Sequence, residues 1–189
     1  MELFFDTETS GKFNFKSSYK SQDQPWVVQL GMILSTQDDI FSEMSFLIQS
    51  DGRKITDGAF NVHKIFAGEC DKYGITEGTS CYLFLELLMN ANTIVCHNVS
   101  FDRLMIANLL YRNRYKGEAE FLMNYDSYCT MQHGTDITRI PHRGRYKWPT
   151  LQELYYFLFN NKLEGAHDAL VDTRAMRKCY YSMTGDIPF

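Results

Sequence analysis

The first constraint on the fold is an apolar run rich in Val and Leu at residues 26–34 (WVVQLGMIL), which predicts a β-strand. Residues 2–6 form a shorter apolar run that ends in acids, and residues 40–48 (IFSEMSFLI) form a third run. Only a short polar turn at 35–39 separates the last two runs. The chain is therefore expected to begin with an antiparallel meander of three strands.

The middle of the sequence changes to helical spacing. Thr79 is the predicted N-cap of a helix in which these apolar residues share one face: Leu83, Phe84, Leu87 and Leu88. Residues 93–96 (TIVC) are short and β-branched, and residues 101–111 after them are apolar nearly all round. This order predicts a strand that leads into a buried helix.

Two further helices are expected near the C-terminus. Thr150 and Glu153 fit a capping box in front of apolar residues at helical spacing. The last helix is expected to run from about Ala169 to about Met183 and to end near Gly185. Together these elements predict an α+β fold, in which the meander is followed by strands that alternate with helices.

Length and composition exclude several protein classes. The chain has 189 residues, which fits one domain at residues 1–189, and its 44% apolar and 22% charged residues are typical of a globular protein. No apolar run reaches the roughly 18 residues that span a bilayer, and the N-terminus lacks the features of a signal peptide. The five cysteines are scattered and form no C-x-x-C pair. These features predict a protein of the reducing cytoplasm without a membrane segment.

The distribution of charge is more informative than the net charge of -4. Residues 10–22 carry three lysines among aromatic residues and no acid. Residues 137–152 carry Arg139, Arg143 and Arg145 beside aromatic residues, again without an acid. Such segments suit a single-stranded nucleic acid, because cations bind phosphates and flat rings stack on bases. Two solvated loops are the alternative interpretation.

Two acids, Asp6 and Glu8, stand two residues apart at the end of the first predicted strand. In an extended chain this spacing puts both carboxylates on one face. At about 4 Å two such charges repel by roughly 4 kcal/mol at an effective dielectric constant near 20. A positive group is therefore expected between them.

Two more acidic positions fall where strands or loops meet helices. Asp102 follows the strand at 93–96, at the junction with the next helix. His167 precedes Asp172 by five residues, and on one regular helix the two would point about 140° apart. They share a target only if His167 lies in the loop before the helix, with Asp168 as N-cap and Gly165 allowing the approach.

Three motifs contain these residues: FFDTETSG at 4–11, HNVSFD at 97–102 and HDALVD at 167–172. In order, spacing and context they resemble the three motifs of the DEDDh 3′-to-5′ exonucleases, the family of the replicative proofreading (epsilon) subunit. Residues 27–33 (VVQLGMI) and 61–65 (NVHKI) resemble further segments of that family. The resemblance implies a ribonuclease H-like mixed sheet, with three antiparallel strands followed by parallel strands and helices in layers on both sides.

The resemblance also implies the roles of the motif residues. Asp6, Glu8, Asp102 and Asp172 would hold two divalent cations, and His167 would act as general base. Ligation by carboxylates favours Mg²⁺ or Mn²⁺ over zinc. An imidazole is mostly neutral near pH 8 and can accept a proton from the attacking water.

The activity implied is a metal-dependent 3′-to-5′ exonuclease that releases nucleoside monophosphates from single-stranded or frayed ends, with DNA slightly preferred. A 3′-to-5′ exoribonuclease or oligoribonuclease would use the same catalytic residues, so it stays open. An inactive module that binds nucleic acid or a polymerase is the alternative of another class. Loss of a motif acid or of His167 would favour that module, and none is lost.

The predicted substrate contacts lie in and around the motifs: Thr7, Thr9, His63, Asn98, Phe101, Arg143 and Arg145. His63 either borders the pocket for the terminal nucleotide or is a buried, hydrogen-bonded histidine. His97 and Asn98 are expected to order the Asp102 junction by local hydrogen bonds. We further expect aromatic residues of the two basic segments to lie under bases, among them Phe13, Phe15, Tyr19, Tyr146 and Trp148.

The C-terminal residues 186–189 (DIPF) resemble the acidic tip of bacterial single-stranded-DNA-binding proteins. A terminal carboxylate on an apolar Phe189 can be captured by a basic pocket of a partner. Asp186 to Phe189 is therefore a candidate docking tail for a DNA polymerase or another replication protein. A tail that packs on its own body or stays disordered is the alternative.

Overall fold

The computed structural model describes residues 1–185 and shows a five-stranded sheet of order β3-β2-β1-β4-β5. The strands of this sheet are β1 (Glu2–Thr9), β2 (Val27–Ser35), β3 (Ile40–Leu47), β4 (Thr93–Cys96) and β5 (Ser127–Cys129). β1, β2 and β3 form the predicted antiparallel meander, whereas β4 pairs in parallel with β1 and β5 in parallel with β4. The candidate docking tail at 186–189 lies outside the described residues.

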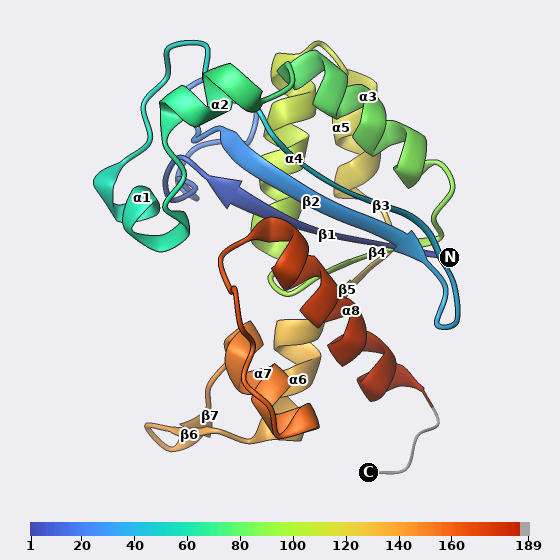
Figure 1. Cartoon of the computed structure of the whole chain (residues 1–189). Coiled ribbons are helices and arrows are strands. Elements are labelled where there is room, and N and C mark those ends of the chain that lie inside the picture. The colour runs from blue at the N-terminus through green and yellow to red at the C-terminus, as the bar shows by residue number, and fades with distance from the viewer. Residues whose placement is uncertain (186–189) are drawn as a thin grey trace.

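Helices cover both faces of the sheet. In chain order they are α1 (Asp57–His63), α2 (Ala67–Tyr73), α3 (Glu77–Leu88), α4 (Val99–Arg112), α5 (Lys116–Met123), α6 (Thr130–Thr138), α7 (Leu151–Phe159) and α8 (Ala169–Thr184). Figure 1 shows α3, α4 and α5 on one side of the sheet and α6, α7 and α8 on the other. This layered arrangement confirms the predicted α+β class. Among residues 1–185 no helix is long and apolar enough to cross a bilayer.

Burial on both faces explains why the run at 26–34 is so apolar. Every residue of β2 is buried, because α4 packs on one face of the sheet and α8 on the other. In β1, neighbouring rings point in opposite directions, as the pleat requires. Phe4 packs on Tyr180 of α8 with ring centroids 5.3 Å apart, and Phe5 packs on Phe84 of α3 at 5.2 Å.

Helix starts agree with the predictions except at α3. Thr150 and Glu153 form the expected capping box of α7. Thr79 is not the N-cap of α3, because Thr76 caps that helix one turn earlier by accepting the Thr79 backbone N–H at 3.1 Å. Both threonines suit an N-cap by residue type. Which of them caps α3 depends on where the folded chain turns from extended to helical backbone.

The remaining elements are short and were not predicted. They comprise α1, α2, α5, α6 and a small hairpin of β6 (Pro141–His142) and β7 (Arg145–Tyr146). Such short segments show no sustained periodicity in the sequence. The hairpin contains Arg143 and Arg145 of the second basic segment, so this part of the segment is a paired β-hairpin and not an extended loop.

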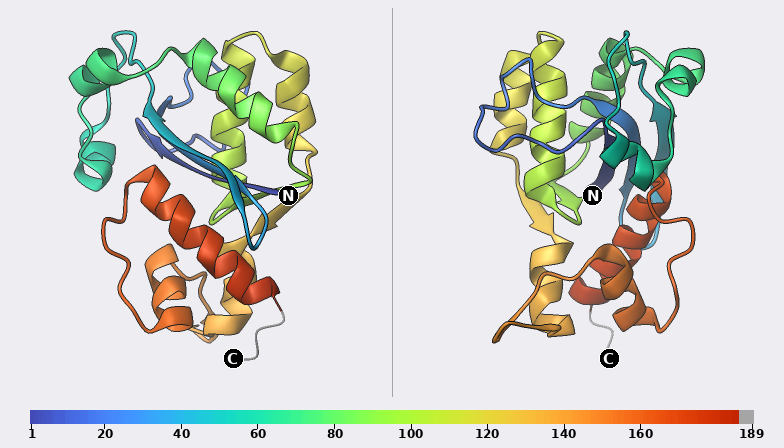
Figure 2. Two further views of the ribbon diagram at one scale, coloured as in Figure 1. Left: turned by 45° about the vertical axis from the view of Figure 1, so that its right-hand side comes forward. Right: turned by 90° about the vertical axis from the view of Figure 1, so that its left-hand side faces the viewer.

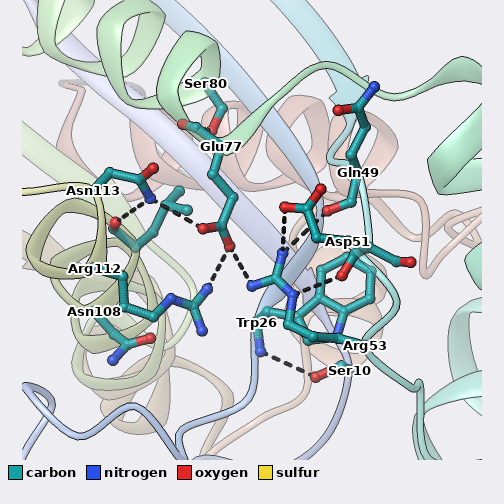
Figure 3. A network of polar contacts seen from close by, with 12 residues as sticks. Ser10, Trp26, Gln49, Asp51, Arg53, Glu77, Ser80, Asn108, Arg112 and Asn113 are labelled. Carbon is teal, nitrogen blue, oxygen red and sulfur yellow. Dashed lines mark hydrogen bonds and ion pairs between the residues drawn. The ribbon is translucent and has the colours of Figure 1, made fainter.

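A buried ionic network ties the connection after β3 to two helices (Figure 3). Glu77 accepts hydrogen bonds from Arg53 Nη1 at 2.6 Å, Arg112 Nη2 at 2.5 Å and Asn113 Nδ2 at 3.0 Å. Arg53 also lies over the Trp26 ring, 4.9 Å from its centroid. The Arg112 side chain is only 8% exposed, so its charge depends on Glu77 for compensation.

We predict that Glu77→Ala lowers the free energy of unfolding by about 3–5 kcal/mol, because the substitution leaves the buried Arg112 charge unpaired. Lys20→Ala is the control, since it breaks the exposed pair with Glu120 and is expected to cost about 1 kcal/mol or less. Urea denaturation followed by circular dichroism measures both values. Equal losses in the two variants would contradict the structural role given to Glu77.

Candidate functional site

The site is built on the last residues of β1. Asp6 and Glu8 follow the alternation of Phe4, so they point to the face that α8 covers. Across the antiparallel pairing, Gly31 of β2 stands opposite Asp6 and Gln29 stands opposite Glu8. This register places the two acids beside the β2 residues that contact the start of α8.

Gln29 and Gly31 hold the first turn of α8 against the sheet. The Gln29 amide donates to Asp168 Oδ2 at 3.0 Å, and its Oε1 accepts the Ala169 backbone N–H at 3.1 Å. A Cβ atom on Gly31 would lie 2.5 Å from the Ala169 carbonyl group, so only glycine permits this approach. Asp168 caps α8, as predicted, by accepting the N–H groups of Leu170 and Val171.

His167 lies in the loop before α8, which confirms the geometric prediction. Its φ is +71° and that of Gly165 is +73°, both in the left-handed region. The His167 backbone N–H donates to Asp172 Oδ2 at 3.1 Å and thereby fixes the loop on the helix. Ligand atoms of Glu8, His167 and Asp172 all lie within 4.8 Å of one another.

Asp102 reaches the same place from α4. Its Oδ1 accepts two hydrogen bonds from Thr7, from the backbone N–H at 3.2 Å and from the hydroxyl at 2.8 Å. Asp102 is buried, with 3% exposure, and follows β4 at the predicted junction. Thr7 is therefore a positioning residue for Asp102, a use of its side chain different from the predicted substrate contact.

Repulsion and burial shape the electrostatics of the four acids. The pKa of Asp6 is raised well above its usual value by burial and then by the charges of Asp102, Asp172 and Glu8. Burial, and next the charge of Asp172, raise the pKa of Glu8 to about 8. Burial raises the pKa of Asp102 to about 7 although the Thr7 hydrogen bonds oppose the change. The structure therefore brings the four predicted acids and His167 together.

A pocket of about 650 Å³ opens beside Glu8. Three of the predicted substrate contacts line it: Thr9, His63 and Phe101. Both interpretations of His63 hold in part, because this side chain borders the pocket and is only 8% exposed. Its Nδ1 accepts the Ile65 N–H at 3.0 Å, and its buried Nε2 has no partner among residues 1–185. Burial lowers the pKa of His63, the Thr9 backbone opposes this change, and the charge of His167 lowers the pKa further, so the two rings are neighbours.

His97 has a structural role, but the expectation of local hydrogen bonds at the Asp102 junction is wrong, because its partners are 33 and 52 residues away in the chain. Its Nδ1 contacts the Thr130 hydroxyl and its Nε2 contacts the Pro149 carbonyl, each at 3.0 Å. Burial lowers the pKa of His97 to about 4. The exposed Asn98 makes no side-chain cap on α4, so the expectation that its side chain orders the junction is wrong. Asn98 as a substrate contact stays a prediction.

The remaining predicted contacts lie outside this cluster. Arg143 and Arg145 are exposed on the β6–β7 hairpin. Phe13 is buried in the core, so the prediction that it lies under a base is wrong. Tyr19 also packs on the core, and the carbonyls of Tyr19 and Ser21 accept from the Asn108 amide. An apolar ring serves stacking or packing equally well, and the sequence does not distinguish the two uses.

Comparisons with known proteins show the fold. No protein-family model matches the sequence, and no curated protein sequence matches it significantly. Solved structures of E. coli exonuclease I are similar to the chain. One, in complex with a dA16 oligonucleotide, has a TM-score of 0.71 and 20% identity over 96% of this chain and 40% of that chain.

Two further exonuclease I structures agree with this comparison. One has a TM-score of 0.74 and 20% identity over 96% of this chain and 40% of that chain. A zinc-bound complex with single-stranded DNA has a TM-score of 0.70 and 20% identity over 95% of this chain and 39% of that chain. The chain thus has the fold of E. coli exonuclease I and spans about two fifths of its length.

Sequence reasoning missed Gln29 and Gly31 as functional positions. Both lie inside the apolar run at 26–34, where they are the only residues without a large apolar side chain. That interruption is the available signal, because a polar amide and a glycine weaken a buried strand unless something contacts them. Their partner, the first turn of α8, is about 140 residues away in the chain, as the Gln29–Ala169 contact shows.

We predict that Gly31→Ala lowers the free energy of unfolding by about 1–3 kcal/mol, because the added methyl group collides with the Ala169 backbone. Gly117→Ala is the matched control. Gly117 stands in α5 with open space around it, so the same change there is expected to stabilise by about 0.5–1 kcal/mol. Urea denaturation measures both variants, and stabilisation by Gly31→Ala would refute the close approach of α8.

The raised carboxyl pKa values predict how stability depends on pH in EDTA. Between about pH 4.5 and pH 8, folded Glu8 retains a proton that the unfolded chain releases. The free energy of unfolding therefore falls as the pH rises through this range. Asp6→Asn removes one repelling charge and should raise Tm at pH 8 by roughly 2–4 °C for each kcal/mol relieved. Asp136→Asn, at an exposed acid of α6, is the control that should not change the slope.

Proposed function

We propose that the chain is a metal-dependent 3′-to-5′ exonuclease of the DEDDh type, acting on single-stranded DNA. The observation that carries the proposal is the meeting of Glu8, His167 and Asp172 within 4.8 Å. Asp6 and Asp102 adjoin that group, as the mutual effect of the charges on the Asp6 pKa indicates. The fold of exonuclease I, solved with DNA oligonucleotides, supports the same activity.

The acids fit divalent cations. Asp172 Oδ1 is buried and accepts no hydrogen bond from residues 1–185, and every cause acting on the pKa of Asp6 and Glu8 raises it. Asp6, Glu8, Asp102 and Asp172 would hold the ions, and this set of oxygens suits Mg²⁺ or Mn²⁺. Two such ions would stabilise the charge that develops on the attacking and leaving oxygens of a phosphodiester.

The chain's own groups would orient and deprotonate the attacking water. The His167 imidazole would accept the proton, because its ring reaches the acids while its backbone N–H is held by Asp172. Thr7 would keep Asp102 in place through two hydrogen bonds. Gln29 and Gly31 would keep the start of α8, and with it His167, at the required distance from β1.

The pocket beside Glu8 would receive the terminal nucleotide. The pocket is lined by the aromatic ring of Phe101 and by the polar residues Thr9 and His63. Lys12 also lines it. The His63 Nε2–H would donate to the substrate, since Nδ1 is already an acceptor for Ile65. The 3′ polarity of the cut rests on the motif resemblance.

Oligonucleotide hydrolysis tests the proposal. Incubation of 5′-labelled single-stranded DNA with Mg²⁺ or Mn²⁺ should give a ladder that shortens from the 3′ end, and 3′-labelled DNA should release labelled mononucleotide at once. Asp6→Ala should abolish both products, and Asp136→Asn should leave them unchanged. RNA and duplex DNA of the same sequence identify the preferred substrate. Uncut DNA with either metal would overturn the nuclease assignment.

We predict that His167→Ala lowers kcat by about 10²–10⁴-fold, since the variant lacks the proton acceptor. His133→Ala is the matched control, at an exposed histidine of α6 that stacks on Tyr128. Single-turnover hydrolysis measures the rate constant of each variant, and an unchanged rate constant for His167→Ala would exclude its role as base.

A further inference from the structure

Exposed aromatic side chains gather in the segment from the β6–β7 hairpin to the end of α7. Their exposed fractions lie between 38% for Phe159 and 62% for Trp148. The full set is Tyr146, Trp148, Tyr156, Phe157 and Phe159. In α7 Leu154 is buried, whereas Tyr156, Phe157 and Phe159 stay exposed. Large exposed rings concentrated in one segment indicate an interaction surface.

The same segment is positively charged. Arg139, Arg143 and Arg145 are exposed, and none of them forms an ion pair within residues 1–185. Lys147 is different, because it binds both carboxylate oxygens of Glu153. Arg143 has a φ of +46° in the turn between β6 and β7, and the residue is exposed.

The segment and the candidate site lie on one side of the molecule. In Figure 1 the hairpin projects at the lower left, below the start of α8, and α1 lies at the upper left. The right-hand view of Figure 2 turns this side toward the viewer and shows the hairpin at the lower left and α7 at the lower right, below the loop that precedes α8. A strand that leaves the site along this side would meet the segment.

We propose that this aromatic–basic surface, formed by residues 139–159, binds the 5′ part of the single strand whose 3′ end enters the site. The inference rests on the proposed nuclease function for the identity of the strand. Arginines would contact phosphates, and the exposed rings of Trp148, Tyr156 and Phe157 would stack on successive bases.

The chemistry favours a single strand over other occupants. Glu153 is the one acid in residues 139–159 and is paired with Lys147, so the unpaired charges of this surface are positive and suit a polyanion. A duplex would satisfy the arginines but not the rings, because its bases are already stacked and paired. A second copy of the chain would bring the same positive charge to this surface, and like charges repel.

Trp148 provides a direct probe of this surface. The protein has two tryptophans, and Trp26 is buried with 3% exposure, so added ligands act mainly on Trp148 fluorescence. In EDTA, which prevents hydrolysis, an oligothymidylate of twenty nucleotides should quench the Trp148 fluorescence. An oligothymidylate of four nucleotides should quench little, because it is too short to reach from the site to this surface. The duplex of the long strand should also quench little.

Variants then separate stacking from charge. Tyr156→Ala with Phe157→Ala should weaken binding of the long strand at least about thirtyfold, since each stacked ring contributes about 1 kcal/mol or more; anisotropy of a fluorescein label measures this change. Arg143→Ala with Arg145→Ala should make the binding less dependent on salt. The magnitude of the slope of log K, the association constant, against the logarithm of the salt concentration should fall by about 1.4, since each phosphate contact contributes about 0.7. Tyr82→Ala is the control, because Tyr82 is 57% exposed on α3 and should not affect binding.

The outcomes also distinguish this proposal from the nuclease assignment. Quenching in EDTA, together with no hydrolysis in Mg²⁺, would keep the surface as a binding site and reject the nuclease activity. Hydrolysis in Mg²⁺ without quenching in EDTA would reject the binding role of this surface. Equal affinity of the parent protein and all variants for the long strand would also reject it. Self-association that Tyr156→Ala with Phe157→Ala abolishes would assign the surface to a second copy and overturn the proposal.

Discussion

The contact between β2 and the first turn of α8 is the constraint on which the rest of the site depends. Gly31 lets the Ala169 backbone approach the sheet, and Gln29 binds Asp168 and Ala169 at the same point. Because these residues stand opposite Asp6 and Glu8, one contact fixes the distance between the acids of β1 and those of α8. A helix displaced by one side-chain layer would separate His167 and Asp172 from Glu8.

This close approach carries a cost in stability. Four acids share a small volume, and burial raises the pKa of Asp6, Glu8 and Asp102 by a larger amount than any single neighbouring charge does. The surrounding structure must therefore hold the carboxylates against their repulsion. Thr7 does so for Asp102 by hydrogen bonds, and the left-handed loop at His167 does so for Asp172. Such local strain is common where chemistry requires charges to meet.

Sequence alone predicted the parts of the molecule that depend on residues close together in the chain. The meander, the Asp168 cap and the loop position of His167 follow from spacing and helix geometry, and the structure confirms them. Thr76 and Phe13 show where local pattern fails. Thr76 and Thr79 are equivalent as caps until the tertiary path of the chain is fixed, and a phenylalanine beside lysines serves stacking or packing alike. Gln29 and Gly31 become significant only through the strand register, which pairs residues distant in the chain.

Charge is divided between two parts of the same side of the molecule. A polyanion is repelled by the acids of the site, so cations are needed to attract it. If arginines stood beside Asp6 and Glu8, they would neutralise the carboxylates and compete with divalent ions for the same oxygens. Every cause acting on the pKa of Asp6 and Glu8 in fact raises it, and the exposed Arg143 and Arg145 stand on a separate hairpin. Separation leaves the carboxylate oxygens free to bind metal ions while the hairpin attracts the strand.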